Sequence, residues 1–444
     1  MAEIAGAGEW FAAVSGLADR AEELADPPGT YVGTAFLGML LNKRNQVIFG
    51  RRGTGKTHLL RRLQDELVAR LGELRVLPAY VDGATLGGWM PPCSDPAAIA
   101  LGLYAELVRD TVGELARFID AGLRPGRRER FFPGAPRAQL GQVRDSVARL
   151  DRLLTAGQVR MLPAGGAQAD YEDLDEVVSR QRVAAGGNAA AALSDTRTLG
   201  IKLEAPAAKE LRESVPQVST RTVAGQAYLP FAGVTELIRR LLGMLGEASL
   251  AILVDDWSLL GDADVQPLLA QLLRLTARGG ICVKLACVPG RTRLVLPGED
   301  GRNPVGLELG DDITADVDLD SVVFAGNDIK QLAGFFMALL QSHLAPVIPA
   351  IRDASPDEFA RYMLTERMAD ERVLAELCHA SGAVPRDFIN VFRQATSLQQ
   401  AAGAGTMTVA NVRTAARRLR QSKDRGSLRS PEPRAAPAGA ARLR

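Results

Sequence analysis

The segment Val47-Ile48-Phe49-Gly50-Arg51-Arg52-Gly53-Thr54-Gly55-Lys56-Thr57-His58-Leu59-Leu60 decides how the rest of this chain is interpreted. Its apolar run, Val47–Phe49, predicts a buried parallel strand, because a strand that is covered on both faces is apolar throughout. A glycine-rich turn follows, and the residues from Thr57 onward predict a helix. The turn matches the pattern G-x-x-x-x-G-K-[ST] at every fixed position, which are Gly50, Gly55, Lys56 and Thr57.

This combination of strand, glycine-rich turn and helix suits the binding of a triphosphate with Mg²⁺. Glycines allow backbone N–H groups to surround the phosphate oxygens, and the helix N-terminus adds its positive dipole end. The Lys56 ammonium would reach the β- and γ-phosphates, and the Thr57 hydroxyl would ligate Mg²⁺, which prefers oxygen ligands. The strand–loop–helix context argues against a lysine that follows a glycine turn by chance. We expect the following residues to contact the nucleotide: Gly50, Arg51, Arg52, Gly53, Thr54, Gly55, Lys56, Thr57 and His58.

The composition is that of an ordinary globular protein. The chain has 444 residues, enough for two or three domains, of which 47% are apolar and 24% charged. Its net charge of +1 gives no overall field that would attract nucleic acid or a membrane surface. We expect no membrane span and no signal peptide, because long apolar runs are absent and the first residues lack a basic region. The four cysteines lack metal-ligand spacing, which favours a reducing, cytoplasmic location.

A second element of the expected site lies at residues 249–257, where an apolar run ends in Asp255 and Asp256. The run predicts a buried strand, and ligands of open α/β sheets bind at the carboxyl ends of the strands. Asp255 would hold Mg²⁺, directly or through water, and Asp256 would orient or deprotonate the attacking water. An acidic pair after a strand is a weak signal by itself, because it also starts turns. Downstream of the phosphate-binding turn it becomes specific.

Further strands and helices complete an expected α/β core. Apolar runs predict strands at 75–81 and 281–288, and alternation of apolar and acidic residues predicts an edge strand at 313–319. Helical periodicity predicts helices at 96–121, 231–245 and 264–277. The loop after residue 288 contains Arg291, Thr292 and Arg293, which are either phosphate-sensing residues or parts of a solvated loop.

Residues 122–230 are expected to be an insertion in this core. They have few large apolar residues, and we expect one amphipathic helix at 138–154 followed mostly by loop. Nine arginines lie between residues 124 and 160. They form either a solvated helical face or a contact surface for an anionic partner, such as nucleic acid or another subunit.

The C-terminal part is expected to be all helical. Helical patterns occupy 328–344, 371–380, 385–400 and 408–423, and a capping box occurs at 355–358. The expected domains are a helical segment at 1–30, an α/β core at 31–326, a helical lid at 327–424 and a disordered basic tail at 425–444. The tail either contacts nucleic acid or keeps the protein soluble.

Several motifs resemble those of known ATPases. Residues 50–57 and 250–256 are similar to the two signatures of P-loop ATPases of the additional-strand division, in which a further strand, here 281–288, lies between the two signature strands. Residues 381–388, Ser-Gly-Ala-Val-Pro-Arg-Asp-Phe, resemble the start of a lid helix in AAA+ ATPases of the origin-recognition type. The resemblance implies that Arg386 reaches the γ-phosphate. Residues 50–58, 255–258 and 306–310 are also similar to a set of uncharacterised bacterial ATPases.

The sequence departs from this family in ways that affect its expected activity. Cys287 stands where a polar sensor usually ends the fourth strand, and Asp256 replaces the usual glutamate, as in the signal-transducing STAND ATPases. Both departures imply slow hydrolysis or a switch. The expected lid is followed only by the short tail, so the DNA-reading domain of origin-type ATPases is not implied. The arginine finger stays open, with Arg291, Arg293 and Arg302 as candidates.

The sequence therefore predicts a regulatory, AAA+/STAND-like ATPase that binds ATP with Mg²⁺ and hydrolyses it slowly. Lys56, Asp256 and Arg386 are the expected catalytic residues, and Thr57 and Asp255 are the expected Mg²⁺ ligands. A protein partner or self-association is expected, with nucleic acid as a further possible partner and no membrane. The alternative is a non-catalytic, nucleotide-gated module that assembles on nucleic acid or protein. A P-loop kinase for a small molecule would not explain the helical lid.

Overall fold

A computed structural model describes residues 6–18, 34–88, 95–132, 136–155, 159–162, 221–223, 226–246, 248–297, 304–321 and 329–427. The chain forms two compact units. The first, here called the helical unit, comprises Met1–Val32, Gly53–Gly55 and Ser321–Arg444. The second, here called the α/β unit, comprises Gly33–Arg52 and Lys56–Asp320. Among the described residues, no helix combines the length and the apolar character that crossing a membrane requires.

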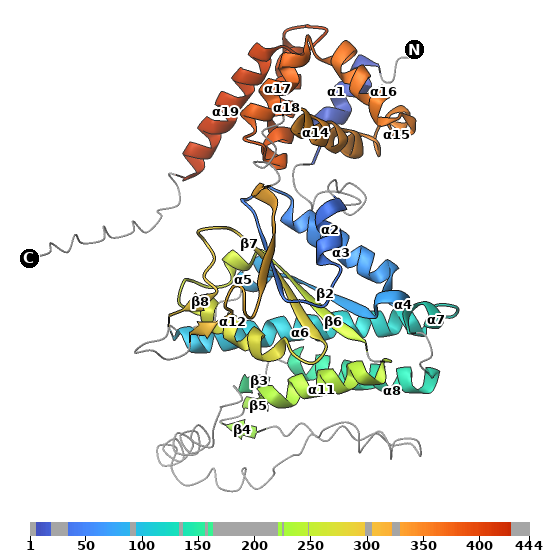
Figure 1. Ribbon diagram of the computed structural model, residues 1–444, viewed down its shortest axis with the longest axis vertical. Coiled ribbons are helices and arrows are strands. Elements are labelled where there is room, and N and C mark those ends of the chain that lie inside the picture. Colours follow the sequence, from blue (N-terminus) through green and yellow to red (C-terminus); the bar gives the residue numbers. More distant parts are fainter. Residues whose placement is uncertain are drawn as a thin grey trace, which may run out of the picture. The chain divides into compact units, whose positions relative to one another are not determined.

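The α/β unit is built on a five-stranded sheet in the order β10-β1-β7-β6-β2 (Figure 1). Every neighbouring pair in this sheet is parallel, which confirms the expected parallel α/β core. The strands are β1 (Gln46–Phe49), β2 (Val76–Asp82), β6 (Ser249–Asp255), β7 (Ile281–Cys287) and β10 (Thr314–Asp318). Strand β7 lies between β1 and β6, where the sequence resemblance places it.

The burial of each strand follows from its position in the sheet. All residues of β6 and β7 are buried, because these strands have a neighbour on both sides and helices on both faces. Strand β2 pairs with β6 alone, so it lies at an edge of the sheet. Pro78 is accommodated there because an edge strand tolerates a residue without a backbone N–H group.

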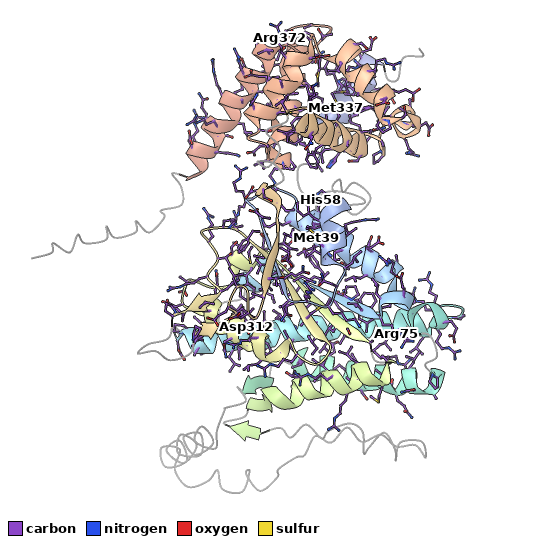
Figure 2. The ribbon with its side chains drawn as sticks, in the orientation of Figure 1. Met39, His58, Arg75, Asp312, Met337 and Arg372 are labelled. Carbon is purple, nitrogen blue, oxygen red and sulfur yellow. The ribbon has the colours of Figure 1, made fainter. Side chains whose placement is uncertain are left out.

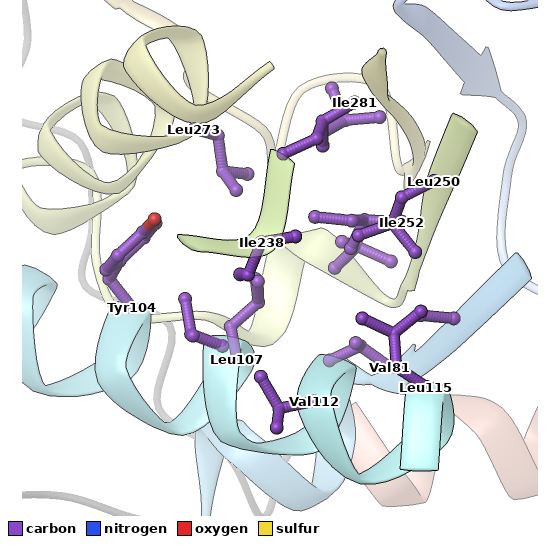
Figure 3. Close-up of a cluster of buried hydrophobic side chains, with 14 of the residues drawn as sticks. Val81, Tyr104, Leu107, Val112, Leu115, Ile238, Leu250, Ile252, Leu273 and Ile281 are labelled. Carbon is purple, nitrogen blue, oxygen red and sulfur yellow. The ribbon is translucent and has the colours of Figure 1, made fainter. Parts of the chain in front are cut away.

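Helices cover both faces of the sheet. Helix α3 (Lys56–Ala69) contacts β2, β6 and β7, while α6 (Pro96–Leu123) and α12 (Val265–Thr276) pack against each other. Right-handed crossovers place α3 on one face and the other two helices on the opposite face. Figure 3 shows part of the apolar core in which side chains of α6 and α12 pack with those of strands β2, β6 and β7. The remaining elements of this unit are α2 (Thr34–Leu40), α4 (Leu71–Leu74), α5 (Gly83–Gly87), α7 (Arg128–Phe131), α11 (Phe231–Met244), η2 (Trp257–Leu259), β8 (Val295–Leu296) and β9 (Val305–Gly306).

The insertion contains more regular structure than the sequence predicts. Its expected helix is present as α8 (Arg137–Thr155), which packs against α6. After it, the described residues form a small sheet of β3 (Val159–Leu162), β5 (Gln226–Pro230) and β4 (Arg221–Val223), and the expected loop falls mostly on residues outside the described part. These short strands escape prediction because their pairing is non-local. Residues 163–220 lie outside the described part.

The helical unit contains the helices expected for the C-terminal part. They are α14 (Ile329–Leu344), α15 (Pro349–Asp353), α16 (Pro356–Tyr362), the π-helical turn η4 (Met363–Arg367), α17 (Glu371–Ala380), α18 (Pro385–Ala401) and α19 (Val409–Ser427). Ser355 and Glu358 form the expected capping box. Gly382, with φ of 54°, follows the end of α17. Helix α19 extends to Ser427, and the rest of the expected tail, residues 428–444, lies outside the described part.

The N-terminal helix α1 (Ala7–Ser15) belongs to the hydrophobic core of the helical unit. Trp10 is 1% exposed and meets the rings of Tyr362 and Phe392 edge-on. The Arg367 guanidinium lies 4.8 Å from the Trp10 ring centroid and donates to the Tyr362 hydroxyl at 2.6 Å. The sequence predicts a separate helical segment at 1–30. The structure instead packs a shorter helix with elements more than three hundred residues away in the chain.

A buried lysine lies in the middle of β7, level with the start of β1 and away from the strand ends that were expected to bind nucleotide. Lys284 of β7 is 0% exposed and is paired with Gln46 of β1 in the register of the sheet. Its ammonium donates to Asn42 Oδ1 at 3.0 Å, to the Arg44 carbonyl at 2.9 Å and to Gln46 Oε1. Burial lowers the pKa of Lys284 from its usual 10.5 to about 8.

We expect this lysine to make stability rise with pH in the alkaline range. Between pH 8 and 10.5 the unfolded chain keeps a proton that the folded chain has released, so the free energy of unfolding increases with pH. The increase is at most about 3 kcal/mol, at about 1.4 kcal/mol per pH unit. Urea unfolding at several pH values should show this increase in the free energy of unfolding in the wild type. The increase should also appear in Lys43→Met, which replaces an exposed lysine. It should be missing in Lys284→Met; parallel pH profiles for the three proteins would contradict the assignment.

Candidate functional site

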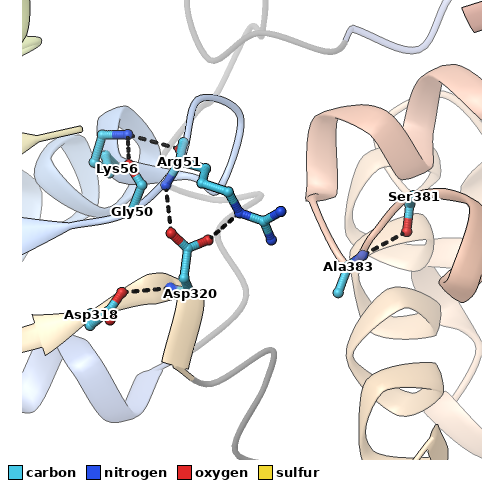
Figure 4. A network of polar contacts seen from close by, with 7 residues as sticks. All are labelled: Gly50, Arg51, Lys56, Asp318, Asp320, Ser381 and Ala383. Carbon is cyan, nitrogen blue, oxygen red and sulfur yellow. Dashed lines mark hydrogen bonds and ion pairs between the residues drawn. The ribbon is translucent and has the colours of Figure 1, made fainter. Parts of the chain in front are cut away.

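The glycine-rich turn after β1 holds Lys56 in a defined position. Lys56 opens α3, and its side chain is buried, with 6% exposure. Its ammonium donates to the carbonyls of Gly50 at 2.7 Å and of Arg51 at 2.9 Å (Figure 4). Gly53 and Gly55 have φ of 85° and 98°, a region that favours glycine, and a Cβ on Gly55 would point into open space. The turn therefore curls around the lysine and leaves room beside Gly55.

Asp320, which follows β10, fastens the same turn from the neighbouring edge of the sheet. Its carboxylate accepts the Arg51 backbone N–H at 2.8 Å and the Arg51 Nε–H at 2.9 Å (Figure 4). Arg51 is one of the loop residues expected to contact nucleotide. Both its backbone amide and its guanidinium donate hydrogen bonds to the Asp320 carboxylate. Sequence reasoning noticed the acidic character of this region but did not connect Asp320 with the turn.

Asp255, at the end of β6, is brought together with Thr57. The Asp255 side chain is 3% exposed and accepts a hydrogen bond from the Thr57 side chain. Its Oδ2 accepts the Tyr80 hydroxyl at 2.8 Å, and its Oδ1 accepts the Asp256 backbone N–H at 2.9 Å. The Arg61 guanidinium covers the Tyr80 ring at 3.5 Å from the centroid. The two residues expected to bind Mg²⁺ are therefore neighbours, and Tyr80 orients one of them.

Asp256 occupies an unusual backbone conformation directly after β6. Its φ and ψ are 45° and 44°, in the left-handed region that aspartate and asparagine tolerate better than most residues. Helix α5 packs closely on this turn: a Cβ on Gly83 would lie 2.3 Å from the Asp255 carbonyl oxygen and 2.9 Å from that of Asp256. Only glycine fits at position 83, so α5 holds the acidic pair in place.

Burial and neighbouring charges shift the pKa values of Lys56 and Asp255. Burial lowers the pKa of the Lys56 ammonium, while the nearby carboxylates of Asp256, Asp255 and Asp320 act in the opposite direction. Burial raises the pKa of the Asp255 carboxyl, and the charge of Asp256 adds to this, whereas the hydrogen bond from Thr57 opposes it. A buried ammonium and a buried carboxylate that are poorly hydrated gain from ligands of opposite charge. The site is thus suited to an anion beside Lys56 and a cation beside Asp255.

Strand β7, which lies between β1 and β6, ends in a neutral side chain. Cys287 is 0% exposed and pairs with Phe49, the residue before Gly50, in the register of the sheet. Burial raises the pKa of its thiol to about 12, and Thr292 lies nearby. Of the other candidates in this loop, Arg293 lies 3.9 Å from Asp264 and is 45% exposed. Thr292 therefore lies beside the strand end, while Arg293 is directed toward α12.

The remaining expected site residues lie in two parts of the chain. Thr57 and His58 are in the first turn of α3, where Figure 2 labels His58. Arg52 is exposed in the turn itself. Arg386 is the second residue of α18 in the helical unit and is half-buried. Just before Arg386, the Ser381 hydroxyl accepts a hydrogen bond from the Ala383 N–H at 3.2 Å (Figure 4). This bond stabilises the turn that leads into α18.

The side-chain oxygens of Thr57 and Asp255 suit a magnesium ion better than a metal whose ligands all come from the protein. Within the described ranges, no group of three His, Cys, Asp or Glu residues could hold a metal ion. Mg²⁺ commonly takes one or two protein oxygens and completes its coordination with water and phosphate oxygens. A hydroxyl and a carboxylate in hydrogen-bond contact provide such a partial oxygen set.

Sequence reasoning missed three residues that shape this site: Tyr80, Gly83 and Asp320. Tyr80 and Gly83 lie at the end of β2, whose carboxyl end meets that of β6 in a parallel sheet. Ligands of parallel sheets bind at the carboxyl ends of the strands. This rule could have drawn attention to all three residues, because each lies near the end of a strand. Their partners, however, depend on strand order and register.

Comparisons with known proteins leave the family open. No family model matches the chain, and no curated protein matches it. Among solved structures, the chain is similar to one described as the structure of C. elegans PCH-2, with 12% sequence identity and a TM-score of 0.27. That similarity covers 95% of this chain and 69% of the other. A TM-score this low does not establish a shared fold, so the functional argument rests on the residues of the site.

Proposed function

We propose that this chain binds ATP with Mg²⁺ and hydrolyses it slowly, as a conformational switch that acts on a partner protein. The observation that supports this best is the meeting of three groups at the carboxyl ends of parallel strands in one sheet. These are the Lys56 ammonium, the Thr57 hydroxyl and the Asp255 carboxylate. Each has the chemistry that binding of a magnesium–triphosphate complex requires.

Binding would use the charges that the fold keeps poorly hydrated. Lys56 would exchange its two carbonyl contacts for phosphate oxygens, and the open side of Gly55 would let backbone N–H groups approach them. Thr57 and Asp255 would hold Mg²⁺, which supplies positive charge against the phosphate oxygens. The expected phosphate contacts of Gly50–His58 belong to this proposal.

Hydrolysis would depend on Asp256, which follows the metal-binding aspartate. Asp256 lies in a left-handed turn directly after Asp255, and we propose that one carboxylate holds the ion while the other positions and deprotonates water. Arg386 would stabilise negative charge on the γ-phosphate, as the resemblance implies. Departure of the anionic phosphate after hydrolysis would change the environment of α18 and so alter the surface that a partner recognises.

The strand order supports the additional-strand type of P-loop ATPase. In the sheet, β7 separates the strand before the phosphate-binding turn from the strand that ends in the acidic pair. The end of β7 therefore lies between Gly50 and Asp255, where a residue can sense the γ-phosphate. The helical unit with Arg386 would act as the lid of an AAA+/STAND-like enzyme.

A second candidate function is a nucleotide-gated binding module that hardly hydrolyses ATP. Cys287 favours it, because a neutral, fully buried thiol stands at the end of β7 in place of an amide side chain. A thiol is a weak hydrogen-bond donor and would orient the attacking water poorly. The nearby Thr292 hydroxyl could compensate for this in the hydrolysing protein.

Calorimetry and single-turnover kinetics on the full chain test these functions. We expect ATP to bind in the presence of Mg²⁺ and to bind much more weakly when EDTA is added. Enzyme in excess over radiolabelled ATP should then release phosphate in a single slow phase. Binding without phosphate release would select the non-catalytic module, and absence of Mg²⁺-dependent ATP binding by a folded protein would refute both.

We expect Tyr80→Phe to weaken the binding of Mg²⁺ in the ATP complex about tenfold, because a hydrogen bond to a charged carboxylate contributes about 1.5 kcal/mol or more. Phenylalanine keeps the ring beneath Arg61 and removes only the hydroxyl that orients Asp255. Titration of Mg²⁺ at fixed ATP, followed by calorimetry, measures the change. The affinity for ATP in EDTA should stay the same; an equal loss with and without Mg²⁺ would point to a general structural effect.

A further inference from the structure

The positive charge of the helical unit is concentrated on its last helix. In residues 329–408, seven basic residues face eight acidic ones, whereas α19 has six basic residues and a single acidic one, Asp424. The basic residues of α19 are Arg413, Arg417, Arg418, Arg420, Lys423 and Arg425. This helix therefore carries a net charge of +5, while the others together are nearly neutral.

Two of these cations attach α19 to the helices beside it. Arg413 forms two hydrogen bonds with the Glu376 carboxylate of α17, at 3.0 and 3.1 Å. Lys423 contacts both oxygens of Asp387 in α18, at 2.7 and 2.6 Å. Figure 1 shows α19 lying along α17 and α18 at the margin of the helical unit. The helix is thus held at both ends of its basic segment.

The other four basic residues face solvent. Arg417, Arg418, Arg420 and Arg425 are exposed, and none has an ion pair or hydrogen bond with any residue that the structure describes. Neighbouring like charges at helical spacing destabilise a helix slightly, as between Arg413, Arg417 and Arg420. A helix that served only solubility could avoid this repulsion by alternating acidic and basic residues, as the rest of the unit does.

We propose that the exposed arginine surface of α19, defined as Arg417, Arg418, Arg420 and Arg425, binds the phosphate backbone of nucleic acid. All four are arginines, whose planar guanidinium groups can each donate two hydrogen bonds to one phosphate. From Arg417 to Arg425 the helix rises about 12 Å, a length over which each strand of a DNA duplex presents about three to four phosphates. Number, charge and spacing therefore agree with backbone binding without sequence preference.

The test is the salt dependence of binding to a fluorescent DNA duplex, followed by anisotropy with the full chain in the absence of nucleotide. The quadruple variant Arg417→Gln, Arg418→Gln, Arg420→Gln, Arg425→Gln removes the surface and breaks no described ion pair. We expect its affinity at about 50 mM salt to fall at least tenfold, and the slope of log affinity against log salt to become shallower by about 3.6.

The matched control removes the same charge elsewhere on the unit. Its four substitutions, Lys330→Gln, Arg352→Gln, Arg361→Gln and Arg372→Gln, are all at exposed positions outside α19. This control should bind DNA nearly as the wild type does; an equal loss in both quadruple variants would overturn the proposal, as would unchanged binding by the α19 variant. Polyglutamate should compete poorly with the duplex. Effective competition would show that the surface takes an acidic protein, and would also overturn the proposal.

Discussion

Replacing Lys56 by alanine is expected to abolish detectable binding of ATP with Mg²⁺. The buried ammonium is held at the glycine-rich turn, and it would contact two phosphates. A hydrogen bond to a charged group contributes about 1.5–3 kcal/mol, so the loss of two corresponds to a decrease in affinity of about 10²–10⁴-fold. Calorimetry with wild type and variant at the same Mg²⁺ concentration measures it.

Two further proteins separate this loss from a folding defect. Lys43→Ala removes an exposed lysine from the same unit and should bind ATP as the wild type does. Lys56→Met keeps most of the side-chain volume and should lose binding to the same extent as Lys56→Ala. Thermal unfolding should show that both Lys56 variants are folded. Near-normal ATP affinity in a folded Lys56→Met protein would remove Lys56 from the proposed site.

The second large effect is expected from Asp256→Asn, which should leave ATP bound and unhydrolysed. Asparagine tolerates the left-handed backbone of this position, so the turn beside Gly83 should keep its shape. It cannot accept the proton of the attacking water, and loss of a general base typically slows the chemical step by about 10²–10⁴-fold. Affinity for ATP should change little, since Lys56 and the metal-binding pair remain.

Single-turnover release of radiolabelled phosphate, followed by recovery of bound nucleotide, measures this effect. Asp264→Asn, at an exposed aspartate in the following segment, is the matched control and should hydrolyse ATP at the wild-type rate. Unchanged phosphate release by Asp256→Asn would show that this carboxylate does not activate water. If the wild type itself releases no phosphate, the comparison supports the non-catalytic module instead.

Much of the α/β unit could be predicted because its signals are local. The apolar runs that became β1, β6 and β7 are continuous in sequence, and burial on both faces requires this pattern. The glycine-rich turn and the capping box of α16 follow from rules that involve only neighbouring residues.

The features that escaped prediction all depend on contacts between distant parts of the chain. Tyr80 reaches Asp255 because β2 and β6 pair in one particular register, in which Tyr80 lies opposite Leu253. A shift by one residue would turn the ring to the other face of the sheet. Asp320 reaches Arg51 because β10 is added beside β1, and Trp10 joins the helical core across nearly the whole chain.

The sequence by itself determined the glycine-rich turn, the acidic pair and the existence of a parallel α/β core followed by helices. Local spacing and apolar periodicity suffice for these, because they reflect backbone conformation and burial of single elements. Only the tertiary structure decided that Thr57 meets Asp255, that Tyr80 and Gly83 hold the acidic pair, and that four arginines of α19 stay unpaired within the described residues. The physical reason is that strand order, register and helix packing bring together side chains whose separation in sequence carries no information about their distance in space.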